Sequence, residues 1–193
     1  MLRFVFSILF IAFCSTPVLA ATLSFDSYES GENGNKLELG AANMRLLKGA
    51  NAFVYQTGDF GVGTGGGFCA VTSDFTCKGK AQIVFKLPVE NLRFRSYFAG
   101  YGDKTLIKVF REGKRVVTLN MRRDGRIDLT KMRNINRLVF VDKSKPGGTG
   151  MAFGSFGFRV VEPEVVPLPG SLLFMATVLA LTCFIPGRRR TGQ

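Results

Sequence analysis

The sequence contains no histidine. Histidine is the side chain used most often as a general base and is a common metal ligand, so its absence removes the usual basis for acid–base catalysis and for a zinc site. The sequence also lacks a Gly-x-Ser-x-Gly motif, which carries the nucleophile of many hydrolases. We therefore predict that the protein is not an enzyme and that it has no cofactor and no metal.

Acidic residues offer two weaker candidates for chemistry. Asp124 and Asp128 could act as a pair in sugar hydrolysis, but both lie in a turn among arginines, where ion pairing is the ordinary interpretation. Four oxygen-bearing residues could ligate calcium, although their spacing fits no defined calcium loop: Asp26, Glu29, Glu32 and Asn33.

Cysteine is scarce, with four in the chain. Cys14 and Cys183 lie in the hydrophobic segments at the two ends, which leaves only Cys69 and Cys77 in the central region. Two cysteines eight residues apart in an exported domain predict one disulfide that closes a short loop. The alternative is half of a metal site, for which no histidine or further cysteine of the domain is available.

The first 20 residues have the pattern of a cleavable signal peptide. Arg3 provides the positive charge, residues 4–13 form an apolar run, and Val18 and Ala20 provide small residues before the cut. An N-terminal membrane anchor is the alternative. The apolar run is short for a bilayer, and a proline at position 17 interrupts it, so we predict export of a domain that begins at residue 21.

The other end of the chain carries a second hydrophobic segment. Residues 163–170 form a proline-rich linker, residues 171–185 form a predicted hydrophobic helix, and residues 186–193 form a basic tail. Basic residues that flank an apolar span stay on the cytoplasmic side, which places the domain outside. The cluster that would do this is Arg188, Arg189 and Arg190.

These C-terminal parts resemble the bacterial sorting signal known as PEP-CTERM, in its VPLPA-type variant. Three parts stand in the expected order: the motif Val166-Pro167-Leu168-Pro169-Gly170, the apolar residues 171–185 and the basic residues 188–190. The sequence departs from the variant at Gly170, where alanine is usual. The resemblance implies an exosortase-type enzyme as a partner, which would remove the tail, and delivery to the cell surface or medium, often alongside exopolysaccharide. A permanent single-pass anchor is the alternative.

The region between residues 21 and 162 is predicted to be an all-β domain. No stretch of it has a helical period over a helical length, and turn residues separate many short runs. Such a pattern favours a jelly-roll-like antiparallel β-sandwich, the kind of domain that often precedes such tails. The predicted strands cover residues 22–25, 52–56, 82–87, 92–98, 105–111, 115–120, 137–142 and 153–161.

Within these runs, Leu92, Phe94, Ser96 and Phe98 are predicted to share one face of a strand, opposite Arg93, Arg95 and Tyr97. Residues 112–114 are predicted to connect a hairpin. The glycine-rich residues 58–67 superficially suggest a phosphate-binding loop. A strand with Cys69, and no helix, is expected behind them, so a flexible surface loop is favoured. Most of the 19 phenylalanines are interpreted as core residues.

The charge of the domain is uneven. Residues 21–77 contain three basic and six acidic residues, whereas residues 78–145 contain 18 basic and six acidic residues. The second region should attract polyanions, and outside the cell an acidic polysaccharide is a leading example. The alternative is that the cations only solvate exposed strand faces and prevent edge pairing. The candidate residues are Arg93, Arg95, Arg111, Lys114, Arg115, Arg122, Arg123 and Arg126.

Together these features predict an exported, non-enzymatic surface or matrix protein that interacts with glycans or other polyanions. It would be membrane-anchored through its C-terminal helix before processing and extracellular afterwards. A permanently anchored surface protein is the second hypothesis, and a secreted glycan-active enzyme is the third. Dedicated nucleic-acid binding is not expected, because export removes the usual partner and no recognition motif is present.

Overall fold

The computed structural model describes residues 20–49 and 51–161, and this part of the chain is all-β, as predicted. It contains one 3₁₀ turn, η1 (Asp59–Gly61), and no α-helix within the described residues. The strands are β1 (Ala20–Leu23), β2 (Gly31–Asn33), β3 (Lys36–Glu38), β4 (Ala42–Lys48), β5 (Asn51–Tyr55), β6 (Gly67–Val71), β7 (Lys80–Tyr97), β8 (Thr105–Arg111), β9 (Lys114–Met121), β10 (Gly125–Leu129), β11 (Ile135–Asp142) and β12 (Ala152–Val160).

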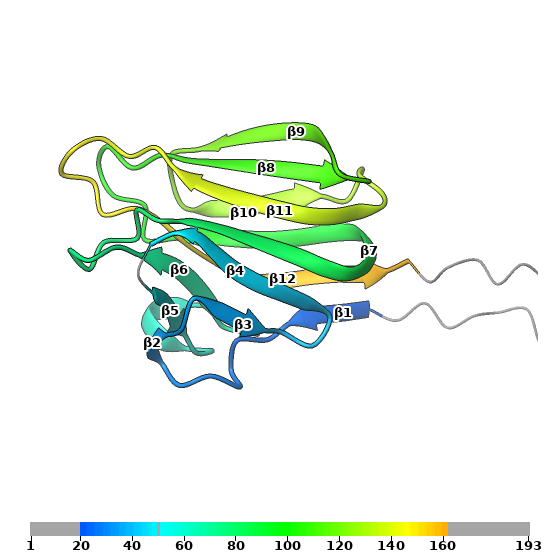
Figure 1. The fold of residues 1–193 in the computed structure, drawn as a ribbon, viewed down its shortest axis with the longest axis horizontal. Helices are drawn as coiled ribbons and strands as arrows, with labels where there is room; N and C mark the ends of the chain where they lie inside the picture. Colours follow the sequence, from blue (N-terminus) through cyan, green and yellow to red (C-terminus); the bar gives the residue numbers. More distant parts are fainter. Residues whose placement is uncertain (1–19, 50, 162–193) are drawn as a thin grey trace, which may run out of the picture. The chain divides into compact units, whose positions relative to one another are not determined.

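All twelve strands belong to one large sheet, and the pairs between them are antiparallel. The long strand β7 is its centre (Figure 1). The N-terminal half of β7 pairs with β4 and β11, whereas its C-terminal half pairs with β10 and β12. Strands β8 and β9 extend the sheet beyond β11, and β6, β5 and β2 extend it beyond β12. A single strand therefore connects two groups of neighbours.

Aromatic side chains from both groups of strands meet in one hydrophobic core. The rings of Phe94 on β7 and Phe156 on β12 are stacked with centroids 4.9 Å apart. Phe140 on β11 lies 4.7 Å from Phe153 on β12 and 5.5 Å from Phe68 on β6. All five residues are at most 4 % exposed. The interpretation of most phenylalanines as packing residues is therefore correct for this group.

Two predicted strands, residues 82–87 and 92–98, are one continuous strand in the structure. Pro88 lies between the two predicted strands and has no N–H to donate to a ladder. The strand continues because its partners change there: Val89 pairs with Ile135 at a register irregularity of β11, and the carbonyl of Pro88 accepts a hydrogen bond from the Val161 amide. At this irregularity β11 does not pair with Pro88, so the ladder does not need an N–H from the proline.

The predicted face of residues 92–98 is correct for its first three members and wrong for its last. Leu92, Phe94 and Ser96 are buried, as alternation requires. The strand ends at Tyr97, and Phe98 takes a positive φ of 66°. Its side chain therefore leaves the pattern and packs in a second, smaller cluster with Tyr97.

The hairpin between β8 and β9 is tighter than predicted. Lys114 belongs to β9, so the connection consists only of Glu112 and Gly113, with φ of 50° and 77°. Two successive positive φ values are the mark of a type I′ turn, whose twist matches that of the two strands. The short strands β2, β3 and β10 were not predicted, and neither was β4, although alternate burial of Ala42, Met44 and Leu46 is a clear strand pattern.

The two ends of the described domain lie together. Ala20 at the start of β1 pairs with Arg159 near the end of β12. The loops at residues 72–76, 98–104 and 143–151 lie at the opposite end of the sheet (Figure 1). Strand β12 runs between these two ends and spans about 30 Å at the usual rise per residue.

Several predictions fall on parts of the chain outside the described residues. These are the signal peptide before residue 20, the linker and sorting motif at 163–170, the hydrophobic segment at 171–185 and the basic residues 188–190. Within residues 20–49 and 51–161, no helix has the length and apolar character needed to cross a membrane.

Candidate functional site

The C-terminal half of β7 carries a row of exposed cations. Alternation along the strand points Arg93 and Arg95 outward, opposite to the buried Leu92, Phe94 and Ser96. The antiparallel register with β10 places Arg126 directly across from Arg95 and Asp128 across from Arg93. The cross-strand neighbours of a pleated sheet lie within contact distance, so three arginines come together on this face.

The turn between β9 and β10 adds two more cations. The hydroxyl of Ser96 donates a hydrogen bond of 3.1 Å to the carbonyl of Arg123, and the Ala99 amide donates one of 2.7 Å to the carboxylate of Asp124. These bonds hold the turn beside the end of β7. We use the name β7 basic face for five exposed arginines, three on the outward face of β7 and β10 and two in the adjoining turn: Arg93, Arg95, Arg126, Arg122 and Arg123.

The three remaining candidates lie elsewhere. Arg111, Lys114 and Arg115 occupy the β8–β9 hairpin, whose register places Thr105 and Met121 at the other end of the same strand pair. Seven residues of strand separate the two ends by about 20 Å. The eight predicted cations therefore form two groups rather than one stripe. Beside the hairpin, a hollow of about 350 Å³ is lined by Arg111 together with Lys131 and Arg133, two cations that we did not predict.

Few carboxylates neutralise the β7 basic face. Arg93 pairs with Asp128 at 3.4 Å, and both side chains are about half exposed. Among the described residues, the other four arginines of the face have no carboxylate within 4.0 Å. Hydrogen bonds from the hydroxyl and amide of Thr130, and then the charge of Arg93, lower the pKa of Asp128. Asp128 is therefore ionised at neutral pH and offsets the charge of Arg93, while the other four arginines keep the face positive.

The two acidic candidates for sugar hydrolysis have separate roles. Asp128 lies on β10 and not in a turn as expected, and it forms an ion pair with Arg93, as the sequence suggested. Asp124 lies in the β9–β10 turn and accepts the amide of Ala99. The proposed calcium ligands are also engaged elsewhere: Asp26 accepts bonds from the amide and hydroxyl of Thr57, and Glu32 accepts one from Asn51. Within the described part of the chain, no three or more metal-ligating side chains come together.

An aromatic cleft that the sequence did not predict lies next to this face. Its volume is about 300 Å³, and its walls include four rings: Tyr55, Phe60, Phe75 and Phe98. The ring of Phe98 lies 5.1 Å from that of Tyr55, and the ring of Phe60 stands nearly perpendicular to both. The rings thus form a corner. Burial raises the pKa of the Tyr55 hydroxyl, which therefore stays protonated.

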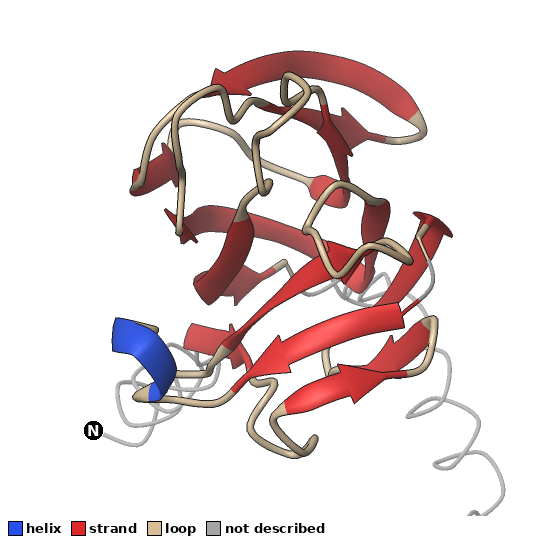
Figure 2. Cartoon of the chain, turned by 90° about the vertical axis from the view of Figure 1, so that its left-hand side faces the viewer, coloured by secondary structure: helices blue, strands red, loops and turns tan. Residues whose placement is uncertain are grey.

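Three of these four rings are carried by residues with unusual backbone geometry. Phe60, Phe75 and Phe98 have positive φ values of 47°, 57° and 66°. Such angles are disfavoured for bulky residues and cost on the order of 1–3 kcal/mol each. Phe60 is 82 % exposed and Phe75 is 79 % exposed, so burial of their side chains in the core does not offset the cost of this backbone geometry. Figure 2 views this end of the domain, with η1 in blue and the loops in tan.

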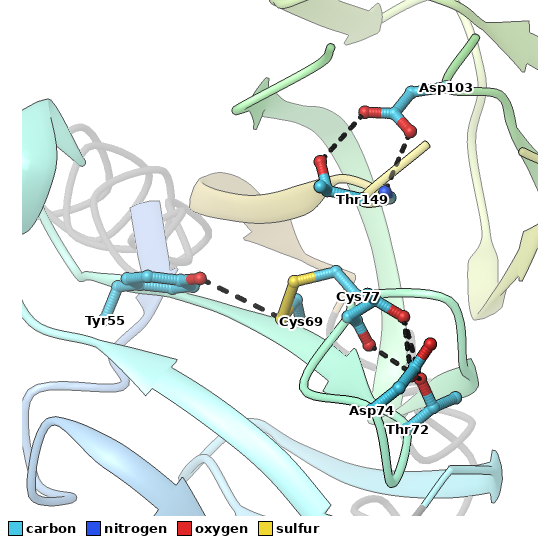
Figure 3. Close-up of a disulfide and its surroundings, with 9 residues drawn as sticks. Tyr55, Cys69, Thr72, Asp74, Cys77, Asp103 and Thr149 are labelled. Carbon is cyan, nitrogen blue, oxygen red and sulfur yellow. Dashed lines mark hydrogen bonds between the residues drawn. A yellow bond between two sulfur atoms is a disulfide. The ribbon is translucent and has the colours of Figure 1, made fainter. Parts of the chain in front are cut away.

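Covalent and hydrogen-bonded links fix the loops that carry Phe75 and Phe98. The predicted disulfide joins Cys69 on β6 to Cys77, with Cα atoms 5.3 Å apart (Figure 3). The amide of Cys77 donates to the carbonyl of Thr149, and the carboxylate of Asp103 accepts the amide of Gly150 at 2.8 Å. Asp103 is only 3 % exposed and also accepts the amide of Gly100. These links connect three loops into one unit.

Gly150 is the closest point between two of these loops. Its φ is 82°, and a Cβ atom at this position would collide with the carbonyl of Cys77. Beyond the disulfide, the loop with Phe75 is held by Asp74, which accepts hydrogen bonds from the hydroxyls of Thr72 and Thr76 (Figure 3). These bonds lower the pKa of Asp74.

Tyr97 connects the cleft to the β7 basic face. The guanidinium carbon of Arg95 lies 5.9 Å from the centre of the Tyr97 ring, within the range of a cation–π contact. On its other side, Tyr97 lies 6.0 Å from Phe98. Its hydroxyl contacts Ser155 at 2.7 Å and accepts the amide of Gly63, so the ring is held in place. Cations and aromatic rings are therefore parts of one continuous surface.

Only part of this site was visible in the amino-acid sequence. The cations were visible as charge and alternation, but the four rings come from segments up to 43 residues apart (Tyr55 to Phe98), and only the fold brings them together. The nearest usable signal was the placement of Phe60 and Phe75 beside acidic and polar residues, which is unusual for core positions. No protein-family model matches the chain, and no curated protein matches its sequence.

Proposed function

We propose that this chain is an exported, non-enzymatic surface or matrix protein whose β-domain binds acidic polysaccharide through the β7 basic face. The observation that carries the proposal is the concentration of five exposed arginines on one part of the sheet, with a carboxylate within 4.0 Å of only Arg93 in the described chain. A positive field of this kind attracts flexible polyanions, and its strength depends on salt.

The arrangement of the strands supports a jelly-roll-like β-sandwich as the form of this domain. The two groups of strands that share β7 contribute rings to one core, as two packed sheets would. In a sandwich, loops at one end of the sheets commonly carry the binding surface. The cleft and the turn with Arg122 and Arg123 occupy that position.

Sorting by an exosortase-type enzyme is the second part of the proposal, and it rests on the C-terminal sequence pattern. After export, the proline motif at residues 166–170 would be presented to the processing enzyme and the hydrophobic tail removed. The described domain ends beside its own beginning, because β1 pairs with the end of β12. An attachment at that end would leave the loops with the basic face directed away from it.

The polysaccharide part is tested by binding of polygalacturonate, an acidic polysaccharide, to the full chain in detergent. We expect affinity in low salt that falls steeply as salt rises, because the Debye length shrinks from about 10 Å at 0.1 M to about 3 Å at 1 M. The double variant Arg95→Gln/Arg126→Gln should bind several-fold more weakly. Absence of binding in low salt would refute this part.

The sorting part is tested by the intact mass of the protein recovered from the envelope and the medium of its native host. Loss of the residues after the proline motif is the expected result. A species that keeps residues 171–193 would favour the permanent anchor instead, and would leave the binding proposal untouched.

A further inference from the structure

The aromatic cleft has the composition of a ligand site rather than of a packing defect. Four rings dominate its walls, and Cys77, Thr149 and Gly150 complete the lining. Ligand pockets typically combine apolar and aromatic walls with a few polar groups, and their volumes begin near roughly 300 Å³. The cleft of about 300 Å³ lies at this lower limit, which suits one ring-sized group of a longer ligand.

Two rings of the cleft, those of Phe60 and Phe75, are exposed although their backbone geometry is strained. Phe60 and Phe75 are largely exposed and adopt positive φ, a combination that neither folding nor packing favours. The Cys69–Cys77 disulfide fixes the loop that carries Phe75, and the Asp59 carboxylate next to Phe60 accepts hydrogen bonds from the Ser30 hydroxyl and the Gln56 amide. Strained residues that are fixed by their surroundings cluster at ligand-binding sites. A ligand that covers Phe60 and Phe75 would explain the arrangement.

The neighbouring charges restrict the chemistry of that ligand. Arg95 lies against Tyr97, which lies against Phe98, so the cleft opens onto the β7 basic face. Arg123 is tied to the same end of β7 through Ser96. A purely apolar partner would leave these cations without a counter-charge, and a simple polyanion would leave the rings uncovered. The surface fits a ligand with an apolar face and a negatively charged edge.

A pyranose ring of an acidic polysaccharide has both features. Its C–H groups form an apolar face that can lie on an aromatic ring, while its hydroxyl and carboxylate groups project from the edge. We propose that the cleft formed by Tyr55, Phe60, Phe75 and Phe98 binds one uronate ring of such a chain, with neighbouring carboxylates on the β7 basic face. This inference rests on the proposed function, because it assigns the sugar-recognising part of the same surface.

The experiment compares three probes on the full chain in detergent: trigalacturonate, a linear polyphosphate of similar charge, and neutral cellotriose. The variants are Phe60→Ala and Phe98→Ala, and the matched control is Tyr101→Ala, a residue that is 98 % exposed on the same 98–104 loop as Phe98 but does not line the cleft. We expect each cleft variant to bind trigalacturonate about tenfold more weakly. Polyphosphate binding should stay within about twofold, and the control should match the wild type.

Saturation-transfer NMR provides a second readout. When the aromatic protons of the protein are irradiated, saturation should pass to the ring C–H protons of bound trigalacturonate. This transfer should be weaker in Phe60→Ala. Equal losses for trigalacturonate and polyphosphate, or no transfer from aromatic protons, would overturn the inference. Self-association of the chain that is abolished by Phe60→Ala would also overturn it, because a second copy would then occupy the cleft.

The probes separate this inference from the proposed function. If polyphosphate and trigalacturonate bind equally and the cleft variants have no effect, the basic face binds polyanions and the cleft inference alone fails. If cellotriose binds through the cleft, and the affinities for trigalacturonate and polyphosphate do not change with salt, then the cleft binds sugar and the polyanion proposal fails.

Discussion

The β8–β9 hairpin lies at the opposite end of the domain from the loops at residues 72–76 and 98–104, which carry rings of the aromatic cleft (Figure 1). The hairpin and the cleft are built in different ways. The hairpin brings Arg111, Lys114 and Arg115 together through strand pairing and a two-residue turn, all within five positions of the sequence. The cleft gathers four rings through a disulfide, a buried carboxylate and three positive φ values. Local pairing is enough to cluster charge, whereas a shaped aromatic site needs contacts between distant segments.

The largest effect is expected from crowding the cleft at its tightest point. Gly150→Ala introduces a Cβ atom against the carbonyl of Cys77 at a φ of 82°. We expect the free energy of unfolding to fall by about 3 kcal/mol, measured by urea denaturation. Gly125→Ala is the matched control, because a Cβ atom there meets nothing within 4 Å, and its effect should stay within about 0.5 kcal/mol. Equal effects at the two glycines would contradict the account.

Removing the disulfide comes next. The double variant Cys69→Ala/Cys77→Ala opens a loop closed across a separation of eight residues. Chain-entropy estimates place the loss of stability at roughly 2–3 kcal/mol. Because Cys77 also lines the cleft, binding of trigalacturonate should weaken more than binding of polyphosphate. A stable variant with unchanged sugar binding would show that the disulfide does not shape the site.

The comparison of the two basic groups gives a smaller, purely electrostatic effect. Arg95→Gln/Arg126→Gln removes two charges from the β7 basic face, and Lys114→Gln/Arg115→Gln removes two from the hairpin. We expect polygalacturonate affinity to fall about fivefold for the first pair and less than about twofold for the second, measured at fixed salt. If the hairpin variant shows the larger loss, the binding face has been assigned to the wrong group.

The smallest effect concerns acid. Hydrogen bonds from Thr72 and then Thr76 lower the pKa of Asp74 in the folded protein, so the unfolded state binds a proton more readily. The stabilisation is complete above about pH 4 and is lost as pH falls through the lowered folded pKa. Asp74→Asn should remove this part of the acid dependence. Denaturation of wild type and variant between pH 5 and about pH 2 measures it, and parallel curves would contradict it.

Features that depend on local sequence could be predicted, whereas features that depend on contacts between distant segments could not. The hairpin strands, the outward positions of Arg93 and Arg95 and the Cys69–Cys77 disulfide were predicted, because each depends on alternation or on short spacing. Continuity of β7 through Pro88 was missed, since it depends on a change of partner strands.

The aromatic cleft is the clearest case of what the sequence could not provide. In the sequence, Phe98 continues the alternation of apolar residues along 92–98, which predicts a core position. Its positive φ directs the side chain toward the cleft instead. A local turn after Gln56 brings Phe60 back to Tyr55, but nothing local brings Phe75 or Phe98 near them. The division of the eight cations into two groups likewise depends on which strands pair, because the β9–β10 turn, and not the hairpin, is held beside Ser96.

The most direct test of the account is an NMR map of backbone amide shifts in the full chain as trigalacturonate is added. The account predicts the largest changes at residues 93–99, at the β9–β10 turn with Arg122 and Arg123, and around Phe60 and Phe75. The hairpin residues 111–115 should change little. Amide shift changes confined to the hairpin, or changes of similar size at all exposed cations, would contradict a binding site formed by the β7 basic face and the aromatic cleft.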